Sequence, residues 1–217
     1  MDKTITRRPT YSAFLMHVAL RRAPWRLLFL PISAVFGLGY LLRMVSRDRL
    51  KELNQLLFLG GVASTRQLEP HIESYADKVM ARNIQPGALR QIAADKAEGC
   101  QLVMATASYA LYAAPIARRL GFDVVLGTRL IGEDSAHVRA RIDGENCYGE
   151  AKLMRINDWI ENASEANDTI AVARTYSDHV SDVPMLLLGS EPVAVNPHPP
   201  LADHARAHGW RIADWRQ

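Results

Sequence analysis

The sequence predicts an α/β fold, a doubly wound, Rossmann-like parallel sheet with an inserted all-helical cap. From residue 11 to residue 97, apolar residues recur at the three- and four-residue spacing of amphipathic helices. After Gly99, short apolar strands alternate with helices, which is typical of a parallel sheet covered on both faces. With 217 residues, 48% of them hydrophobic, the chain can bury a full core with an insertion. We therefore assign 1–10 and 98–217 to the core and 11–97 to the cap.

The helical spacing in the cap is regular, and we expect no strand within it. Ser64 and Gln67 form a plausible capping box for the helix that follows them. The apolar positions that define the helices are Phe14, Leu15, Val18 and Leu20, then Leu50, Leu53, Leu56 and Leu57, then Leu68, Ile72, Tyr75 and Val79.

The core pattern predicts a series of strands and helices after a first strand that would precede Met1. That first core strand therefore looks truncated in this chain. The strands are expected at 101–105, 122–126, 169–176, 192–195 and 210–213, with an antiparallel hairpin element at 136–142. The helices are expected at 109–120, 150–162, 183–188 and 201–208.

One apolar run in the predicted cap, 27–42, stands apart from the other helical segments. It has 16 residues, including Pro31 and Gly37, whereas a membrane span needs about 20 apolar residues. We expect it to be buried in the cap core, with contact to an anionic membrane surface as the alternative. The arginines that flank or enter the run support the second interpretation: Arg21, Arg22, Arg26, Arg43, Arg47 and Arg49.

Composition restricts the partners and the compartment. The formal net charge is only +3, which argues against a nucleic-acid-binding protein. The chain has two cysteines, Cys100 and Cys147, with no Cys-x-x-Cys pair, and we expect no secretory leader. We therefore expect packed thiols and a cytoplasmic protein that is either soluble or peripheral to a membrane. The oligomeric state is left open.

Candidate functional residues follow predicted strand ends. Thr106 follows the strand 101–105, Asp178 follows the strand 169–176, and Asp2 would follow the first strand. Ligands of doubly wound sheets bind just beyond the carboxyl ends of the strands. The start Asp2-Lys3-Thr4 matches the end of an Asp-x-Asp-x-Thr phosphate-transfer loop, whose first Asp would stand immediately before Met1.

These residue types fit phosphomonoester hydrolysis through an aspartyl-phosphate. Asp2 is placed to act as general acid and base, and its backbone carbonyl could bind a metal. Thr106, expected at a helix start, and its neighbour Ala107 would hold phosphoryl oxygens, with Lys152 as the cation. Asp178 and Asp182 would bind Mg2+, with Asp178 as the better direct ligand and Asp182 orienting water or Lys152.

Together these motifs resemble the haloacid dehalogenase superfamily, specifically its subfamily IB of phosphoserine phosphatase-like hydrolases. The resemblance covers nearly the whole chain and implies a Mg2+-dependent phosphatase of small phosphorylated substrates, with a helical cap after the first motif. It implies Asp2 and Lys152 as catalytic residues, Thr106 and Lys152 on phosphate, and a metal side formed by Asp178 and Asp182. The matching segments are 2–8, 106–108, 120–123, 127–130, Lys152, 176–186, 195–197 and 209–210.

The sequence departs from the family pattern at three points. The nucleophile is absent from the chain, His179 replaces a common Ser, and Thr106-Ala107-Ser108 replaces the Ser-Gly-Gly of phosphoserine phosphatases. A protonated His179 would disfavour a metal, unless its side chain faces outward. Two alternatives therefore stay open: a phosphatidylglycerophosphate-type lipid phosphatase at the membrane surface, and a catalytically dead phosphate-binding homologue.

Overall fold

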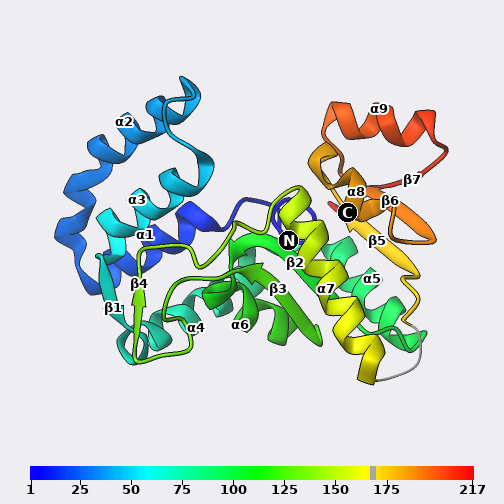
Figure 1. Cartoon of the computed structure of the whole chain (residues 1–217), viewed down its shortest axis with the longest axis horizontal. Coiled ribbons are helices and arrows are strands. Elements are labelled where there is room, and N and C mark those ends of the chain that lie inside the picture. The colour runs from blue at the N-terminus through cyan, green and yellow to red at the C-terminus, as the bar shows by residue number, and fades with distance from the viewer. Residues whose placement is uncertain (167–169) are drawn as a thin grey trace.

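The computed structural model describes residues 1–166 and 170–217. Figure 1 shows a helical region on one side and parallel strands with their covering helices on the other. The segment 11–97 contains α1 (Tyr11–Arg22), η1 (Pro24–Phe29), α2 (Leu30–Leu41), α3 (Arg47–Leu59), β1 (Val62–Ser64) and α4 (Thr65–Arg82), and also α5 (Pro86–Ala97), which lies on the core side (Figure 1). The remainder contains β2 (Val103–Tyr109), α6 (Ala110–Leu120), β3 (Val124–Thr128), β4 (His137–Arg139), α7 (Glu150–Ala166), β5 (Arg174–Ser177), η2 (Val180–Asp182), α8 (Val183–Leu186), β6 (Glu191–Val195), α9 (Pro199–Ala207) and β7 (Arg211–Ala213).

An aromatic cluster joins the helical region to the core. Phe14 on α1 stacks on Tyr112 of α6 with ring centroids 4.5 Å apart, and its edge meets Tyr75 of α4 at 5.4 Å. All three side chains are at most 2% exposed. Burial of aromatic side chains is a main source of stability in such a core. The apolar spacing of the helices thus has the packing role that the sequence predicts.

The helical region nevertheless contains a strand, so the prediction of an uninterrupted helical pattern is wrong. β1 pairs antiparallel with β4, with Ala63 opposite Val138. These two side chains are buried, whereas their neighbours along each strand are more exposed. A three-residue alternation is too short to distinguish from a loop between helices.

The prediction of a capping box at Ser64 and Gln67 is also wrong. In the described chain Ser64 ends β1 and immediately precedes α4, but its side chain makes no capping hydrogen bond. The Gln67 side-chain oxygen accepts instead from Arg22 of α1 at 3.2 Å. A tertiary partner on another helix has replaced the local one.

The core consists of parallel strands, as the fold class requires. β2 pairs with β3, and a second sheet has the order β5-β6-β7, with every pairing parallel. α6 and α7 pack on β2 and β3, α8 packs on β5, and α9 packs on β6 and β7. The doubly wound α/β core with helical insertion is therefore confirmed. Thr169, where we expected a strand to begin, lies outside the described residues, and β5 begins at Arg174.

α5 lies beside this core. The Gly87 N–H donates to the Trp215 carbonyl at 3.0 Å, and Asp95 accepts from Tyr176 Oη at 2.9 Å. A β-carbon on Gly87 would meet Trp215 Cα at 2.5 Å, so only glycine allows this approach. The boundary between cap and core at residue 97 stays a prediction.

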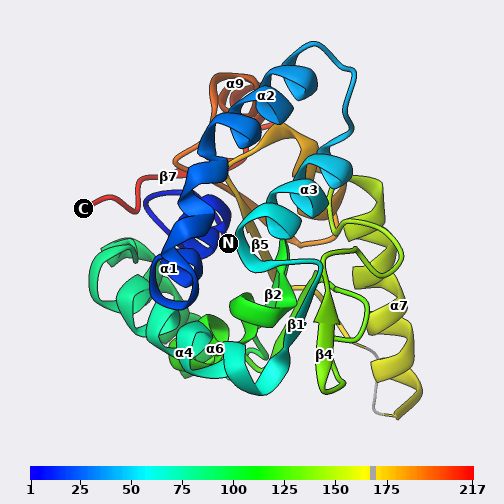
Figure 2. The ribbon, with the colours of Figure 1, turned by 90° about the vertical axis from the view of Figure 1, so that its left-hand side faces the viewer.

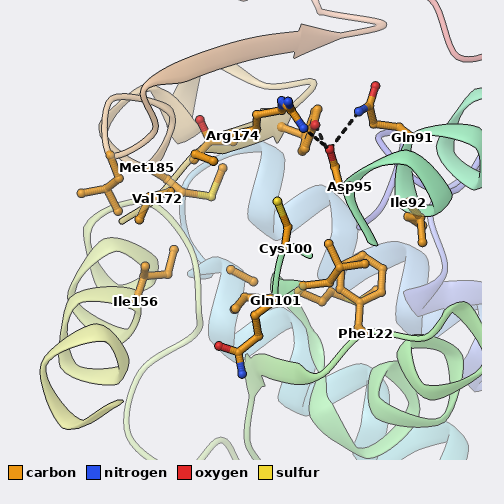
Figure 3. A pocket seen from close by; sticks show the side chains of 18 of the residues that line it. Gln91, Ile92, Asp95, Cys100, Gln101, Phe122, Ile156, Val172, Arg174 and Met185 are labelled. Atoms are coloured by element: carbon orange, nitrogen blue, oxygen red, sulfur yellow. Dashed lines mark hydrogen bonds and ion pairs between the residues drawn. The ribbon is translucent and has the colours of Figure 1, made fainter. Parts of the chain in front are cut away.

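A cleft of about 470 Å3 separates the two parallel sheets. Figure 3 shows its lining side chains converging from several elements, with Ile156 of α7 on one side and Phe122 on the other. Val103, Met104 and Ala105 of β2 line one wall, and Arg174 and Tyr176 of β5 line the opposite wall. Within residues 1–166 and 170–217, β2 has only β3 as a strand partner and β5 has only β6. The two facing strand edges are therefore open toward the cleft.

Candidate active site

The structure brings all the predicted site residues to one cavity of about 290 Å3 at the strand ends. The loop around Asp2, the second half of β2, the start of α7 and the β5–η2 loop all contribute to it. The predicted residues that line it are Asp2, Thr106, Ala107, Lys152, Asp178 and Asp182. Segments up to 180 residues apart in sequence therefore meet as the parallel-sheet topology predicts.

The principal cation of the cavity is Lys152, in the first turn of α7. Its Nζ lies 2.6 Å from Asp182 Oδ1, and Ser177 Oγ donates to the other Asp182 oxygen, also at 2.6 Å. Burial disfavours the charged form of Asp182, but Lys152 and the Ser177 hydroxyl outweigh burial and lower the pKa of this carboxyl. The pair therefore holds a fixed ammonium group beside the cavity.

Asp178 follows β5 directly and is 8% exposed. Its Oδ1 accepts from Thr4 Oγ1 at 2.7 Å, so the first motif and the β5 loop are joined by a hydrogen bond. In the described part of the chain, no hydrogen bond reaches Asp178 Oδ2. One oxygen of this carboxylate is thus available to a ligand in the cavity.

Asp2 is held at the junction of the core loop and the cap. Its Oδ1 accepts from the Thr10 N–H at 3.0 Å and from Thr10 Oγ1 at 2.7 Å. Its Oδ2 accepts from Ser108 Oγ at 3.1 Å. Thr10 is the residue immediately before α1 and Ser108 lies near the end of β2, so the carboxylate links the start of the cap to β2. A network of this kind fixes the orientation of the carboxylate.

Thr106 does not lie at a helix start, contrary to our expectation. β2 continues to Tyr109 with a register shift between Thr106 and Tyr109, and α6 begins only at Ala110. Thr106 Oγ1 accepts from the Ser108 N–H at 3.1 Å within this irregular segment. A bulge changes the direction of the side chains that follow it. Phosphate contacts at Thr106 and Ala107 would therefore come from bulged strand backbone.

His179 is not a simple outward-facing loop residue. Its Nδ1 accepts from the Ser181 N–H at 3.2 Å and lies 2.8 Å from Ser181 Oγ. The imidazole therefore caps the short helix η2, between the two aspartates. This contact uses the unprotonated nitrogen and gives the residue a local structural role.

Two residues that sequence reasoning did not select extend the site. Lys51 of α3 is 8% exposed, and its Nζ donates to the Ala107 carbonyl at 2.7 Å and to Asn146 Oδ1 at 2.9 Å. Burial lowers the pKa of Lys51 to about 8. Arg47, at the start of the same helix, lies 4.0 Å from the centre of the Tyr148 ring, and both line the cavity. Only their basic character within an amphipathic helix could have indicated them.

The predicted metal residues Asp2, Asp178 and Asp182 do not converge on one point. Among residues 1–166 and 170–217, no three His, Cys, Asp or Glu side chains are close enough to hold a metal ion together. Asp182 is committed to Lys152, and Asp2 to Thr10 and Ser108. Mg2+ needs only one or two protein carboxylates and keeps several waters. The donor set therefore fits Mg2+ with Asp178 as the protein carboxylate.

Comparison with known proteins gives a family match. The model of the haloacid dehalogenase-like hydrolase family matches residues 1–187. Protein CicA of Caulobacter vibrioides is 29% identical over 193 residues, which are 88% of this chain and 81% of CicA. Phosphoserine phosphatase SerB1 of Mycobacterium tuberculosis is 35% identical over 163 residues, covering 74% of this chain and 51% of SerB1. The chain thus spans about half the length of SerB1.

Solved structures give the same fold. A protein of unknown function from Bordetella pertussis superposes with a TM-score of 0.81 at 24% identity, covering 99% of this chain and 96% of that one. A substrate-bound phosphoserine phosphatase superposes with a TM-score of 0.58 at 15% identity, covering 100% of this chain and 90% of that one. These likenesses extend over cap and core alike.

Proposed function

The chain belongs to the haloacid dehalogenase-like hydrolase family and is a phosphoric monoester hydrolase, and we propose that it works with Mg2+ through an aspartyl-phosphate. The observation that carries the proposal is the cavity that Asp178 lines together with the ion pair of Lys152 and Asp182. One ammonium, one available carboxylate oxygen and a separately held Asp2 are, besides the nucleophile, the groups that phosphoryl transfer requires.

In the proposed mechanism, Asp2 transfers protons and Lys152 stabilises the negative charge of the phosphoryl group. In the first step a nucleophilic carboxylate forms a bond to phosphorus, the bond to the leaving oxygen breaks, and Asp2 gives its proton to that oxygen. In the second step Asp2 takes a proton from the water that attacks phosphorus. The bond between phosphorus and the nucleophile then breaks, which releases inorganic phosphate and restores the carboxylate. Lys152 offsets the charge on the phosphoryl oxygens throughout.

Asp178 would hold the metal ion through its uncommitted oxygen, and a bound Mg2+ would supply further positive charge to the phosphoryl group. Asp182 acts indirectly, because its ion pair keeps the Lys152 ammonium in place. Thr106 and Ala107 would add hydroxyl and backbone donors.

We place the nucleophile immediately before Met1, from the register of the motif and the shape of the cleft. Met1 lines both the cleft and the catalytic cavity, so a nucleophile one residue before it would lie close to both. The open edges of β2 and β5 provide backbone groups for a strand leading to that point. An apolar strand suits the cleft, because Ile92, Met104 and Ile156 line it.

The substrate is expected to be a small phosphorylated molecule enclosed between cap and core. Arg47 and Tyr148 line the cavity beside the phosphate-binding side, so they are placed to contact the organic part of the substrate. The bulged Thr106-Ala107-Ser108 segment leaves the identity of that part open, and phosphoserine is one candidate for a substrate screen.

Two matched proteins test the mechanism. Both carry the segment encoded in frame before the Met1 codon, one with Asp immediately before Met1 and the other with Asn there. We expect Mg2+-dependent hydrolysis of para-nitrophenyl phosphate by the Asp form, a loss of roughly a thousandfold or more in the Asn form, and no turnover by a chain starting at Met1. Appreciable Mg2+-dependent turnover by the chain starting at Met1 would overturn the register assigned to Asp2.

A further inference from the structure

The segment formed by η1 and α2 is an apolar surface of the molecule. The structure describes all of this segment, and none of its residues is buried. The expectation that the run 27–42 is buried in the cap core is therefore wrong. The exposed side chains include Leu28 at 78%, Val35 at 65% and Leu41 at 75%, together with Trp25, Leu30, Ile32, Leu38, Tyr40, Leu42 and Met44. A continuous apolar surface of this kind indicates a binding partner.

This segment is fixed to the rest of the cap. Arg26 Nη1 donates to the carbonyls of Leu56 and Leu57 at 3.2 and 2.9 Å, and Ser33 Oγ donates to Asn54 Oδ1 at 2.7 Å. Figures 1 and 2 show α2 at the outer edge of the molecule, with α3 beside it. The exposed side chains thus project from a supported helix, which indicates a preformed surface.

The hydrogen bonds of the segment argue that it lies on a membrane surface. The stretch Pro24–Leu41 has a mean hydropathy of 1.3 and, by length and composition alone, passes as a candidate span. The bonds from Arg26 and Ser33 to α3, however, tie it to the folded cap. A membrane span would have to break these bonds, whereas an apolar helix held against a folded domain fits the interface of a bilayer.

The charge around the segment indicates that its partner is an anionic membrane surface. Between Asp2 and Asp48 the sequence has no acidic residue but has eight lysines and arginines. Arg21, Arg22 and Arg43 are exposed at the two ends of the apolar stretch. A two-fold contact between copies through α2 would bring these arginines together, whereas anionic lipid headgroups neutralise them. Trp25 and Tyr40, both exposed, are residue types that favour the membrane interface.

We propose that η1 and α2 form a docking surface for anionic lipid bilayers. The apolar side chains enter the headgroup region, and the flanking arginines contact lipid phosphates. The surface stands close to the catalytic cavity along the chain, because only 42–46 separate α2 from Arg47, which lines that cavity. Docking would therefore hold the cavity near the headgroup layer, whichever phosphomonoester it hydrolyses.

Vesicle flotation tests the surface independently of catalysis. The full chain is mixed with vesicles of phosphatidylcholine alone or of phosphatidylcholine and phosphatidylglycerol in a three-to-one ratio. We expect flotation with the anionic vesicles and much weaker flotation with the neutral ones. The double variant V35E/L38E should lose at least tenfold in binding, because each glutamate adds a negative charge and removes apolar area. The control L187E carries the same kind of change at an exposed residue of the core.

A second pair of variants separates charge from apolar contact. Arg43→Gln should weaken binding about fivefold, as expected for one arginine near an anionic surface, whereas Arg82→Gln at the exposed end of α4 should not. All variants should keep the wild-type melting temperature, because the substituted side chains are exposed. Absence of flotation by the wild type would overturn the proposal. So would equal binding by V35E/L38E, or a dimer that this variant dissociates without vesicle binding by the wild type.

Discussion

The catalytic cavity and the η1–α2 surface differ in whether the fold provides contacts for their side chains. In the cavity each buried charge has a partner: Lys152 contacts Asp182, and Asp178 accepts from Thr4. On the η1–α2 surface, the apolar side chains of the described segment have no cover. Charge inside a protein is costly unless paired, and apolar area outside is costly unless something covers it. The fold itself thus supplies partners for the charged side chains of the cavity, whereas the η1–α2 surface requires something outside the fold to cover it.

The largest effect should come from breaking the charge pair of the cavity. Lys152→Met leaves the buried Asp182 carboxylate without its cation, and we expect the free energy of unfolding to fall by about 3–5 kcal/mol. Urea unfolding at neutral pH measures it. Adding Asp182→Asn should recover much of the loss, because the uncompensated charge is removed. Lys78→Met, on the exposed side of α4, should change stability by less than about 0.5 kcal/mol. Equal losses for Lys152→Met and Lys78→Met would mean that the pair is unimportant.

The sequence was sufficient to predict the parts that depend on periodicity and chain order. Alternating strands and helices predicted the parallel core, and strand ends brought Thr106, Asp178 and Asp2 to one cavity. The topology of a doubly wound sheet makes these positions meet regardless of the details of packing. The roles assigned to the individual side chains stay predictions.

The features that the sequence could not predict depend on tertiary contacts. The strand β1 exists because β4, 73 residues further along by the pairing of Ser64 with His137, provides its partner. Lys51 reaches Ala107 only because the fold brings α3 beside the second half of β2. The exposure of α2 is likewise invisible in its composition, since a buried cap helix has the same apolar residues. Local patterns determine which element forms, and its neighbours determine what it does.

The cap contains a buried histidine, His17, whose titration should make the stability of the protein depend on pH. His17 on α1 is 2% exposed, and burial together with the nearby Arg21 lowers the pKa of His17 to about 4. The unfolded chain binds this proton near pH 6.5, so the unfolded state binds more protons between pH 6.5 and pH 4. The stabilisation is complete above pH 6.5 and is lost as pH falls toward 4, by up to about 3 kcal/mol.

His17→Leu should abolish that part of the acid sensitivity. Urea unfolding at pH 7 and at pH 4 gives the difference for each protein. We expect the gap between the wild type and the variant to change by up to about 3 kcal/mol over this range. His137→Leu, at an exposed position of β4, serves as the control and should follow the wild type. A parallel pH dependence in the wild type and His17→Leu would show that His17 is not the sensitive group.

The smallest effect is expected where the two regions meet, at Thr10. Thr10→Val keeps the shape of the side chain and the backbone N–H bond to Asp2, but removes the 2.7 Å hydroxyl bond to the same carboxylate oxygen. Because one of three donors to Asp2 is lost, we expect the free energy of unfolding to fall by about 1.5 kcal/mol. In the catalytically competent protein, kcat should fall roughly tenfold, because Asp2 is less firmly oriented. Thr65→Val removes a hydroxyl bond to Ser135 on the exposed side of the cap and should leave kcat unchanged. If both variants reduce kcat equally, the hydroxyl of Thr10 affects the cap as a whole and does not specifically position Asp2.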